Sequence, residues 1–189
     1  MAQAKTLTDK DLKKVLNYIA VNKHAARNRA MLLCTAYAGL RVKEVAALTI
    51  ADVWEMDSGI RAEVRLTAEQ TKGDAARTVF FPEKLRKELI SYIACIDRSN
   101  TSKPLFASQK SRTGFTANTL CQHFHYMYKN AGVTGASSHS GRRTFITNLC
   151  ARGVGVRVLM SLAGHKNIGT TQAYIDVNDE QLRKAVELI

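Results

Sequence analysis

The sequence predicts a mixed α+β fold that is mainly α-helical and contains one small antiparallel β-sheet. Apolar residues recur with a period of about 3.6 over most of the chain, and the period changes to about 2 in one middle segment, residues 60–81. The chain has 189 residues and a hydrophobic content of 46%, which suits the core of one domain. The sequence contains no repeat or low-complexity linker, so we expect a single domain over residues 1–189.

Three helices are predicted in the first part of the chain. Thr8 suits a helix N-cap with Asp11 at the third helical position, and the helix that follows has one apolar face, formed by Leu12, Val15, Leu16 and Ile19. Residues 25–38 predict a second, largely buried helix that ends at Gly39, because glycine tolerates the positive φ of a C′ position. A third helix is expected over residues 42–48.

The middle segment predicts a β-hairpin. Apolar and charged side chains alternate in residues 60–66, as in a strand with one buried face. Lys72, Gly73 and Asp74 supply turn residues, and residues 77–81 return as the second strand. After Pro82 the pattern is again helical, over residues 83–98, 117–131, 141–152, 156–163, 170–175 and 179–188.

The charge of the chain indicates a polyanionic partner. Lys and Arg number 28 against 16 Asp and Glu, a formal net charge of +12, which favours nucleic acid or an anionic membrane surface over a merely basic protein. Residues 98–175 contain no acidic residue and carry Arg98, Lys103, Lys110, Arg112, Lys129, Arg142, Arg143, Arg152, Arg157 and Lys166. These cations are spread along helical sequence, so they predict a basic face and double-stranded DNA as the partner.

The cysteines and the hydropathy give no sign of secretion, metal binding or membrane insertion. No two of the four cysteines form a CxxC pair, so we expect small core residues in a reducing compartment at Cys34, Cys95, Cys121 and Cys150. His123 and His125 follow Cys121 at spacings that diverge on a helix, and no metal site is expected there. The longest apolar run, residues 30–40, is far shorter than the ~20 residues of a membrane span, so a cytoplasmic location is predicted.

Polar residues stand at five places where packing does not explain them. They are an arginine between two helices, a lysine in the hairpin turn, a histidine and an arginine at a helix start, a second histidine, and a tyrosine nine residues later: Arg41, Lys72, His139, Arg142, His165 and Tyr174. Each alone has an ordinary explanation, such as a surface cation, a turn residue or a helix cap. Their combination, order and spacing carry the functional prediction.

Together these segments resemble the tyrosine recombinase (phage integrase) family over nearly the whole chain. Family members carry G-L-R-x-x-E, a hairpin lysine, H-x-x-R, L-G-H and S/T-T-x-x-Y in this order. The matching residues are Gly39-Leu40-Arg41-Val42-Lys43-Glu44, Lys72, His139 with Arg142, Ala163-Gly164-His165, and Thr170-Thr171-Gln172-Ala173-Tyr174. Ala163 is a departure, because the family usually has leucine beside this glycine.

The resemblance implies the catalytic-domain fold of that family and a site-specific recombinase or integrase that breaks and rejoins DNA. Tyr174 is then the nucleophile, which forms a covalent 3′-phosphotyrosyl intermediate, and the other five residues complete the catalytic set. The N-terminal core-binding domain that family members usually carry is expected to be absent from this chain. A type IB topoisomerase and a DNA-binding regulator without catalysis are the alternatives.

The residue types suit this chemistry. Arg41 and Arg142 are permanently charged and offer planar forks of donors that match phosphate oxygens. A tyrosine has a reference pKa near ~10, so Tyr174 needs a proton acceptor, for which His139 is the candidate. Lys72 at the hairpin tip is the candidate general acid for the leaving 5′ oxygen, and His165 would bind a phosphate oxygen or position Tyr174. The arginines take the place of a metal, so neither a metal nor another cofactor is expected.

Two further expectations concern partners. Contacts to DNA are predicted for Lys43, Arg77, Arg112, Arg143 and Lys166. Residues 178–189 carry an apolar stripe, formed by Leu182, Ala185, Val186 and Ile189, on a helix that is too short to be stable alone. This helix docks either on its own domain or, as the resemblance implies, on a neighbouring subunit in a tetramer assembled on DNA.

Overall fold

The structure is a computed structural model that describes residues 4–71, 75–109, 113–174, 183 and 186–187. Helices occupy most of this part of the chain, and the strands are short. In chain order the elements are α1 (Asp9–Ala20), α2 (Ala25–Ala38), α3 (Val42–Ala47), α4 (Ile50–Val53), β1 (Trp54–Glu55), β2 (Gly59–Ile60), β3 (Glu63–Leu66), β4 (Arg77–Phe80), α5 (Glu83–Ile93), α6 (Ala117–Asn130), α7 (Ser140–Ala151), α8 (Val156–Ala163) and α9 (Ile168–Gln172).

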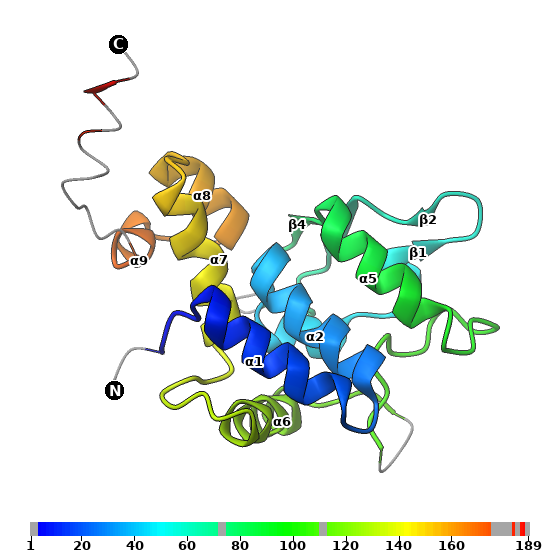
Figure 1. Ribbon diagram of the computed structural model, residues 1–189. Coiled ribbons are helices and arrows are strands. Elements are labelled where there is room, and N and C mark those ends of the chain that lie inside the picture. Colours follow the sequence, from blue (N-terminus) through cyan, green and yellow to red (C-terminus); the bar gives the residue numbers. More distant parts are fainter. Residues whose placement is uncertain (1–3, 72–74, 110–112, 175–182, 184–185, 188–189) are drawn as a thin grey trace.

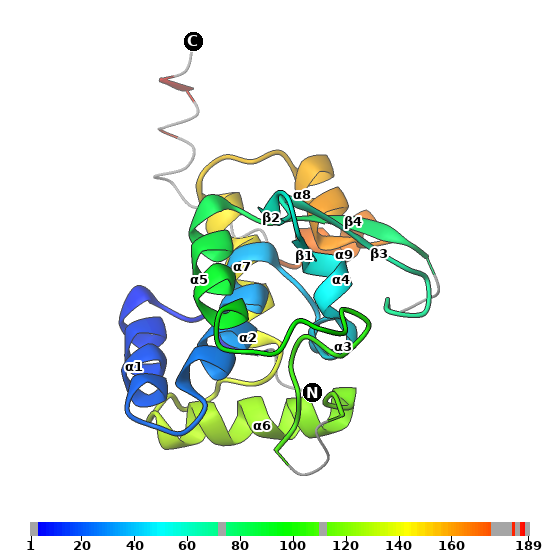
Figure 2. The same ribbon diagram turned by 90° about the vertical axis from the view of Figure 1, so that its right-hand side faces the viewer.

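Helix α2 forms the centre of the molecule, and α1, α5 and α7 pack around it (Figure 1). Its buried residues include Ala30, Met31, Leu32, Leu33 and Cys34, none of which is exposed to solvent. Helix α6 crosses below α2 in the second view and packs against α1 and α3 (Figure 2). This position explains why residues 30–38 of α2 are mainly apolar, since neighbours cover the helix on several sides.

The ends of three helices confirm their sequence signals. Thr8 caps α1, and its hydroxyl accepts from the backbone of Asp11 while the Asp11 carboxylate accepts from the backbone of Thr8. Gly39 ends α2 with φ of 64° and Gly164 ends α8 with φ of 60°, a region that disfavours other residues. The predicted bounds of α2 and α8 are confirmed, and the two glycines stand just before Arg41 and His165, two residues of the predicted catalytic set.

The strands differ in detail from the prediction, although the mixed α+β class is confirmed. Two two-stranded antiparallel sheets are present instead of one, because the predicted strand 60–66 changes partner along its length. Its first part, β2, pairs with β1 so that Ile60 lies opposite Trp54, and its second part, β3, pairs with β4 so that Val64 lies opposite Val79. The strand is interrupted between them, and Ala62, which the alternation placed inside, is exposed.

Other expectations need smaller corrections. Helix α5 ends at Ile93, short of the predicted residue 98, and α9 covers Ile168–Gln172, earlier than predicted. Helix α4, which Thr49 and Asp52 cap reciprocally, was not predicted. Of the four cysteines only Cys34 is buried, because the others lie on partly or fully exposed helix faces and helix ends. The predicted helix 179–188 lies almost wholly outside the described residues. Among the described helices, none is long and apolar enough to cross a membrane.

The contact between α2 and α7 depends on a residue without a side chain. A Cβ atom at Gly141 would lie 2.0 Å from the hydroxyl oxygen of the buried Thr35. We expect Gly141→Ala to lower the free energy of unfolding by about 1–3 kcal/mol, since the two helices would have to separate. Gly155→Ala is the matched control, because nothing lies within 4 Å of a Cβ atom there. Equal urea midpoints for both variants would contradict the prediction.

Candidate active site

The structure brings four of the six predicted catalytic residues together. Arg41 precedes α3, directly after the turn that ends α2, and Arg142 lies in the first turn of α7. His165 follows the glycine that ends α8, and Tyr174 follows α9. The predicted break between His165 and Tyr174 is confirmed, because two short helices replace one continuous helix and allow both side chains to reach the same place.

The end of α8 holds three arginines from three different elements. The backbone carbonyl of Leu162 accepts a hydrogen bond from Arg77 at 2.9 Å, that of Ala163 accepts one from Arg142, and that of Gly164 accepts one from Arg41 at 2.8 Å. The carbonyls at the C-terminus of a helix lack partners within the helix and carry partial negative charge. They are therefore suitable acceptors for guanidinium groups.

A buried carboxylate orders two of these arginines. The side chain of Glu44 is fully buried and accepts hydrogen bonds from Arg41 at 2.9 Å and from Nη2 and Nε of Arg77 at 2.7 and 3.0 Å. Burial alone would raise the pKa of Glu44, but the hydrogen bonds and charges of Arg77 and Arg41 hold it below its ordinary value. Glu44 is thus a buried anion that fixes the orientation of Arg41 and Arg77.

Arg142 has no such carboxylate partner among the described residues. Its side chain is enclosed, with the residue only 5% exposed, and it donates to the carbonyl of Gly39 at 2.6 Å as well as to that of Ala163. Burial and the positive charge of Arg41 lower the pKa of Arg142 to about 9, which leaves it a cation at neutral pH. Among the described residues, Arg41, Arg77 and Arg142 share the single carboxylate of Glu44, so the site keeps net positive charge and attracts an anion.

His165 and Tyr174 lie side by side next to the arginines. Their rings stack with centroids 5.9 Å apart, and the guanidinium of Arg143 lies 5.1 Å from the centre of the Tyr174 ring. His165 Nδ1 is 2.9 Å from the hydroxyl oxygen of Thr171. Burial, followed by the charges of Arg142 and Arg41, lowers the pKa of His165 to about 4, so its imidazole is neutral at pH 7.

The remaining predicted residues differ in their exposure and in whether the structure describes them. His139 is exposed at the N-cap position of α7, where its side chain makes no capping hydrogen bond, and Lys72 lies outside the described residues. Of the predicted DNA contacts, Arg112 also lies outside them and Lys166 is exposed. Lys43 donates to the backbone carbonyl of Thr71 at 2.7 Å.

Arg77 and Arg143 are partly engaged within the protein. The guanidinium of Arg77 binds Glu44 and Leu162, and its side chain is only 11% exposed, so its geometry favours a positioning role over the predicted contact to DNA. Arg143 donates to the hydroxyl of Thr6 at 3.0 Å in addition to lying over Tyr174. Glu44 and Thr171 are not in the predicted catalytic set, although both stand inside the motifs quoted above.

Known proteins are similar to this chain in sequence and in fold. The model of the phage integrase family matches residues 5–181. The tyrosine recombinase XerA of Pyrococcus furiosus is 30% identical over 185 residues, and that of Thermococcus kodakarensis is 32% identical over 186 residues. Each alignment covers 97% of this chain but only 61% and 62% of the relative, so the chain spans about three fifths of the length of these proteins.

Solved structures agree. A crystal structure of XerA recombinase superimposes with a TM-score of 0.76 at 27% identity and covers all of this chain and 66% of that one. The integrase of transposon Tn1549, solved in complex with circular intermediate DNA, has the same fold, with a TM-score of 0.75 at 18% identity over 99% of this chain and 67% of that one. The arrangement of Arg41, Arg142, His165 and Tyr174, the family match and the shared fold agree, and the chain belongs to the phage integrase family of tyrosine recombinases.

Proposed function

We propose that this chain cleaves and rejoins double-stranded DNA as the catalytic part of a site-specific recombinase or integrase. The observation that carries the proposal is the convergence of Arg41 and Arg142 on the end of α8, directly before the stacked pair of His165 and Tyr174. The two guanidiniums supply the positive charge that a phosphodiester requires, and the tyrosine supplies a nucleophile beside it.

In the proposed reaction the Tyr174 oxygen attacks the scissile phosphorus, and the bond from phosphorus to the 5′ oxygen breaks. Negative charge develops on the non-bridging oxygens, which Arg41 and Arg142 bind. His139 accepts the tyrosine proton, and Lys72 donates a proton to the leaving 5′ oxygen. The 3′-phosphotyrosyl bond retains the energy of the broken bond, so attack by a 5′ hydroxyl in the reverse direction rejoins a strand.

Incubation with a nicked suicide substrate tests the proposal. The nick lets the short 5′ fragment diffuse away after cleavage, so rejoining fails and a covalent protein–DNA adduct accumulates. We expect an adduct that survives denaturing electrophoresis and disappears after protease treatment. Binding without any adduct would favour the DNA-binding regulator, and relaxation of supercoiled plasmids by the isolated monomer would favour the topoisomerase.

Binding to DNA is expected to depend strongly on salt. Segment 98–175 carries ten basic residues and no acidic one, so its exposed cations would displace counterions from the phosphates they neutralise. Neutralising about 6 to 10 phosphates weakens binding by roughly 10³- to 10⁵-fold between about 50 and 200 mM salt. Fluorescence anisotropy with a labelled duplex measures the slope, and a nearly flat plot of log K against log salt would contradict a basic binding face.

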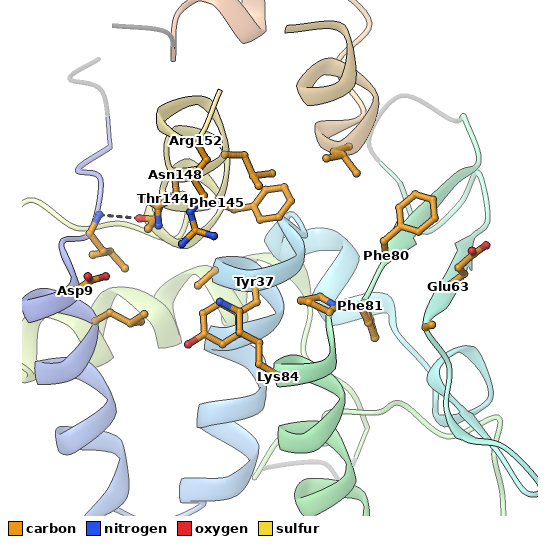
Figure 3. A pocket seen from close by; sticks show the side chains of 17 residues that line it. Asp9, Tyr37, Glu63, Phe80, Phe81, Lys84, Thr144, Phe145, Asn148 and Arg152 are labelled. Atoms are coloured by element: carbon orange, nitrogen blue, oxygen red, sulfur yellow. Dashed lines mark hydrogen bonds between the residues drawn. The ribbon is translucent and has the colours of Figure 1, made fainter. Parts of the chain in front are cut away.

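We further propose that the proteins assemble as tetramers on DNA and that segment 178–189 docks on a neighbouring subunit. A groove of about 560 Å³ between α1, α2, β4 and α7 is suited to receive it, and Phe145 of α7, Phe80 of β4 and Tyr37 of α2 face this groove (Figure 3). Phe80 is 50% exposed, as expected for an apolar surface without an occupant.

The segment and the groove are complementary in character. Val186 in the segment is 67% exposed, and the apolar stripe to which it belongs would cover the apolar wall of the groove. Asp9, Glu63, Lys84 and Arg152 also line the groove, and the segment carries both acidic and basic residues that can pair with them.

Substitution of one groove residue separates assembly from cleavage. Phe80→Glu places a charge where the apolar stripe would dock, so we expect loss of cooperative binding to two-site DNA and of recombination, whereas adduct formation on a single site partly survives. Ile90→Glu on α5 is the control, because Ile90 is 55% exposed but does not line the groove. Deletion of residues 179–189 should reproduce the Phe80→Glu result. Cooperative binding by either altered protein would contradict docking in trans at this groove.

A further inference from the structure

The hydroxyl of Thr171 is buried beside the imidazole of His165. Thr171 lies on α9, three residues before Tyr174, and is not exposed to solvent. Its oxygen is 2.9 Å from His165 Nδ1, and within the described part of the chain this nitrogen is its only hydrogen-bond partner. The contact therefore connects the residue after α8 with the helix that leads to the nucleophile.

The protons in this contact are fixed by what each group can donate. The neutral imidazole carries one N–H, either at Nδ1 or at Nε2, while the threonine hydroxyl carries one O–H. If Nδ1–H donated to the hydroxyl, the buried O–H hydrogen would have no acceptor among the described residues. If the hydroxyl donates to a bare Nδ1, both groups are satisfied, and buried polar groups strongly favour the satisfied arrangement.

We propose that Thr171 is a positioning residue that holds His165 in the tautomer with its proton on Nε2. His165 then presents an N–H donor to the phosphate and cannot accept the proton of Tyr174 through Nε2. The part of this proposal that concerns phosphate rests on the proposed function, whereas the tautomer itself does not. A neutral donor suits this position, because further positive charge would be opposed by Arg142, Arg41 and Arg77.

Nitrogen-15 NMR of the DNA-free protein tests the tautomer directly. Protonated and bare imidazole nitrogens have widely separated chemical shifts, and a His165→Gln variant identifies the His165 signals among those of the five histidines. We expect Nδ1 of His165 to be bare and Nε2 to be protonated at pH 7, with little change between pH 5.5 and 8. A protonated Nδ1 would overturn the proposal, whatever the protein does to DNA.

Two variants of Thr171 test the consequence for cleavage. Thr171→Val preserves the shape of the side chain but removes the hydroxyl, and Thr171→Ser retains the hydroxyl. We expect Thr171→Val to slow adduct formation at saturating DNA by about ten- to a hundredfold, with unchanged DNA affinity and a mixture of His165 tautomers in the NMR spectrum. Thr171→Ser should restore both the rate and the single tautomer.

The outcomes are separable from a purely structural role and from failure of the proposed function. A defect shared equally by Thr171→Ser and Thr171→Val, or a wild-type rate for Thr171→Val, would overturn the positioning role. A wild-type protein that shows the expected tautomer but forms no adduct would refute the recombinase function and leave the assignment of the tautomer intact.

Discussion

Tyr174→Phe is expected to abolish formation of the covalent adduct while DNA affinity stays within a few-fold of wild type. The change removes the attacking oxygen and nothing else that the structure shows. The ring of Tyr174 stacks on His165 and lies under the Arg143 guanidinium, and a phenylalanine ring preserves both contacts. Loss of activity in this variant therefore cannot be attributed to a disordered site.

The measurement combines the suicide-substrate assay with anisotropy binding on the same preparation. Tyr18→Phe is the matched control. The hydroxyl of Tyr18 accepts a hydrogen bond from the side chain of Asn130, and neither residue belongs to the candidate active site. This control should form adducts at the wild-type rate. An adduct that persists in Tyr174→Phe would remove Tyr174 from the role of nucleophile.

Arg142→Lys is expected to reduce the rate of adduct formation by about 10²- to 10³-fold or more, although the charge is retained. The terminal nitrogens of Arg142 donate to the carbonyls of Gly39 and Ala163, and these two bonds fix the guanidinium at the end of α8. A lysine has one ammonium group on a flexible chain and cannot bridge two carbonyls and a phosphate oxygen in one plane. The two helix ends would also lose their shared donor.

Single-turnover cleavage at saturating DNA measures this effect, and the melting temperature reports the loss of the internal contacts. Arg157→Lys is the control, because Arg157 is exposed on α8 and should tolerate the exchange. Arg41→Lys should have a similar effect, since Arg41 also donates to two groups, the carboxylate of Glu44 and the carbonyl of Gly164. If Arg142→Lys cleaved at close to the wild-type rate, positive charge alone would suffice and the fork would be irrelevant.

The sequence predicted those parts of the fold that depend on residues close together in the chain. The bounds of α2 and α8 follow from apolar periodicity and from Gly39 and Gly164, which act within one turn of the chain. The partner change between β2 and β3 was missed, because it depends on which strand lies opposite, and alternation of side chains carries no such information.

The same distinction applies to the site. The order of Arg41, Arg142, His165 and Tyr174 is visible in the sequence, but the partners that orient them are distant along it. Arg77 binds Glu44, 33 residues away, and Leu162, 85 residues away, so its engagement within the protein could only be seen in three dimensions. Backbone carbonyls, which hold all three arginines, have no sequence signature of their own.

The last turn of α8 has a consequence for how the site responds to disturbance. Carbonyls 162–164 belong to consecutive residues, so they cannot move independently, and a shift of this turn breaks the contacts of Arg77, Arg142 and Arg41 together. Each arginine keeps a second contact, to Glu44 or to the carbonyl of Gly39, so such a shift would loosen all three at once without releasing them. Tyr174 lies on the same stretch of chain, just beyond α9, so the same shift would also move the proposed nucleophile. The proposed cleavage would therefore be sensitive to the position of this single turn.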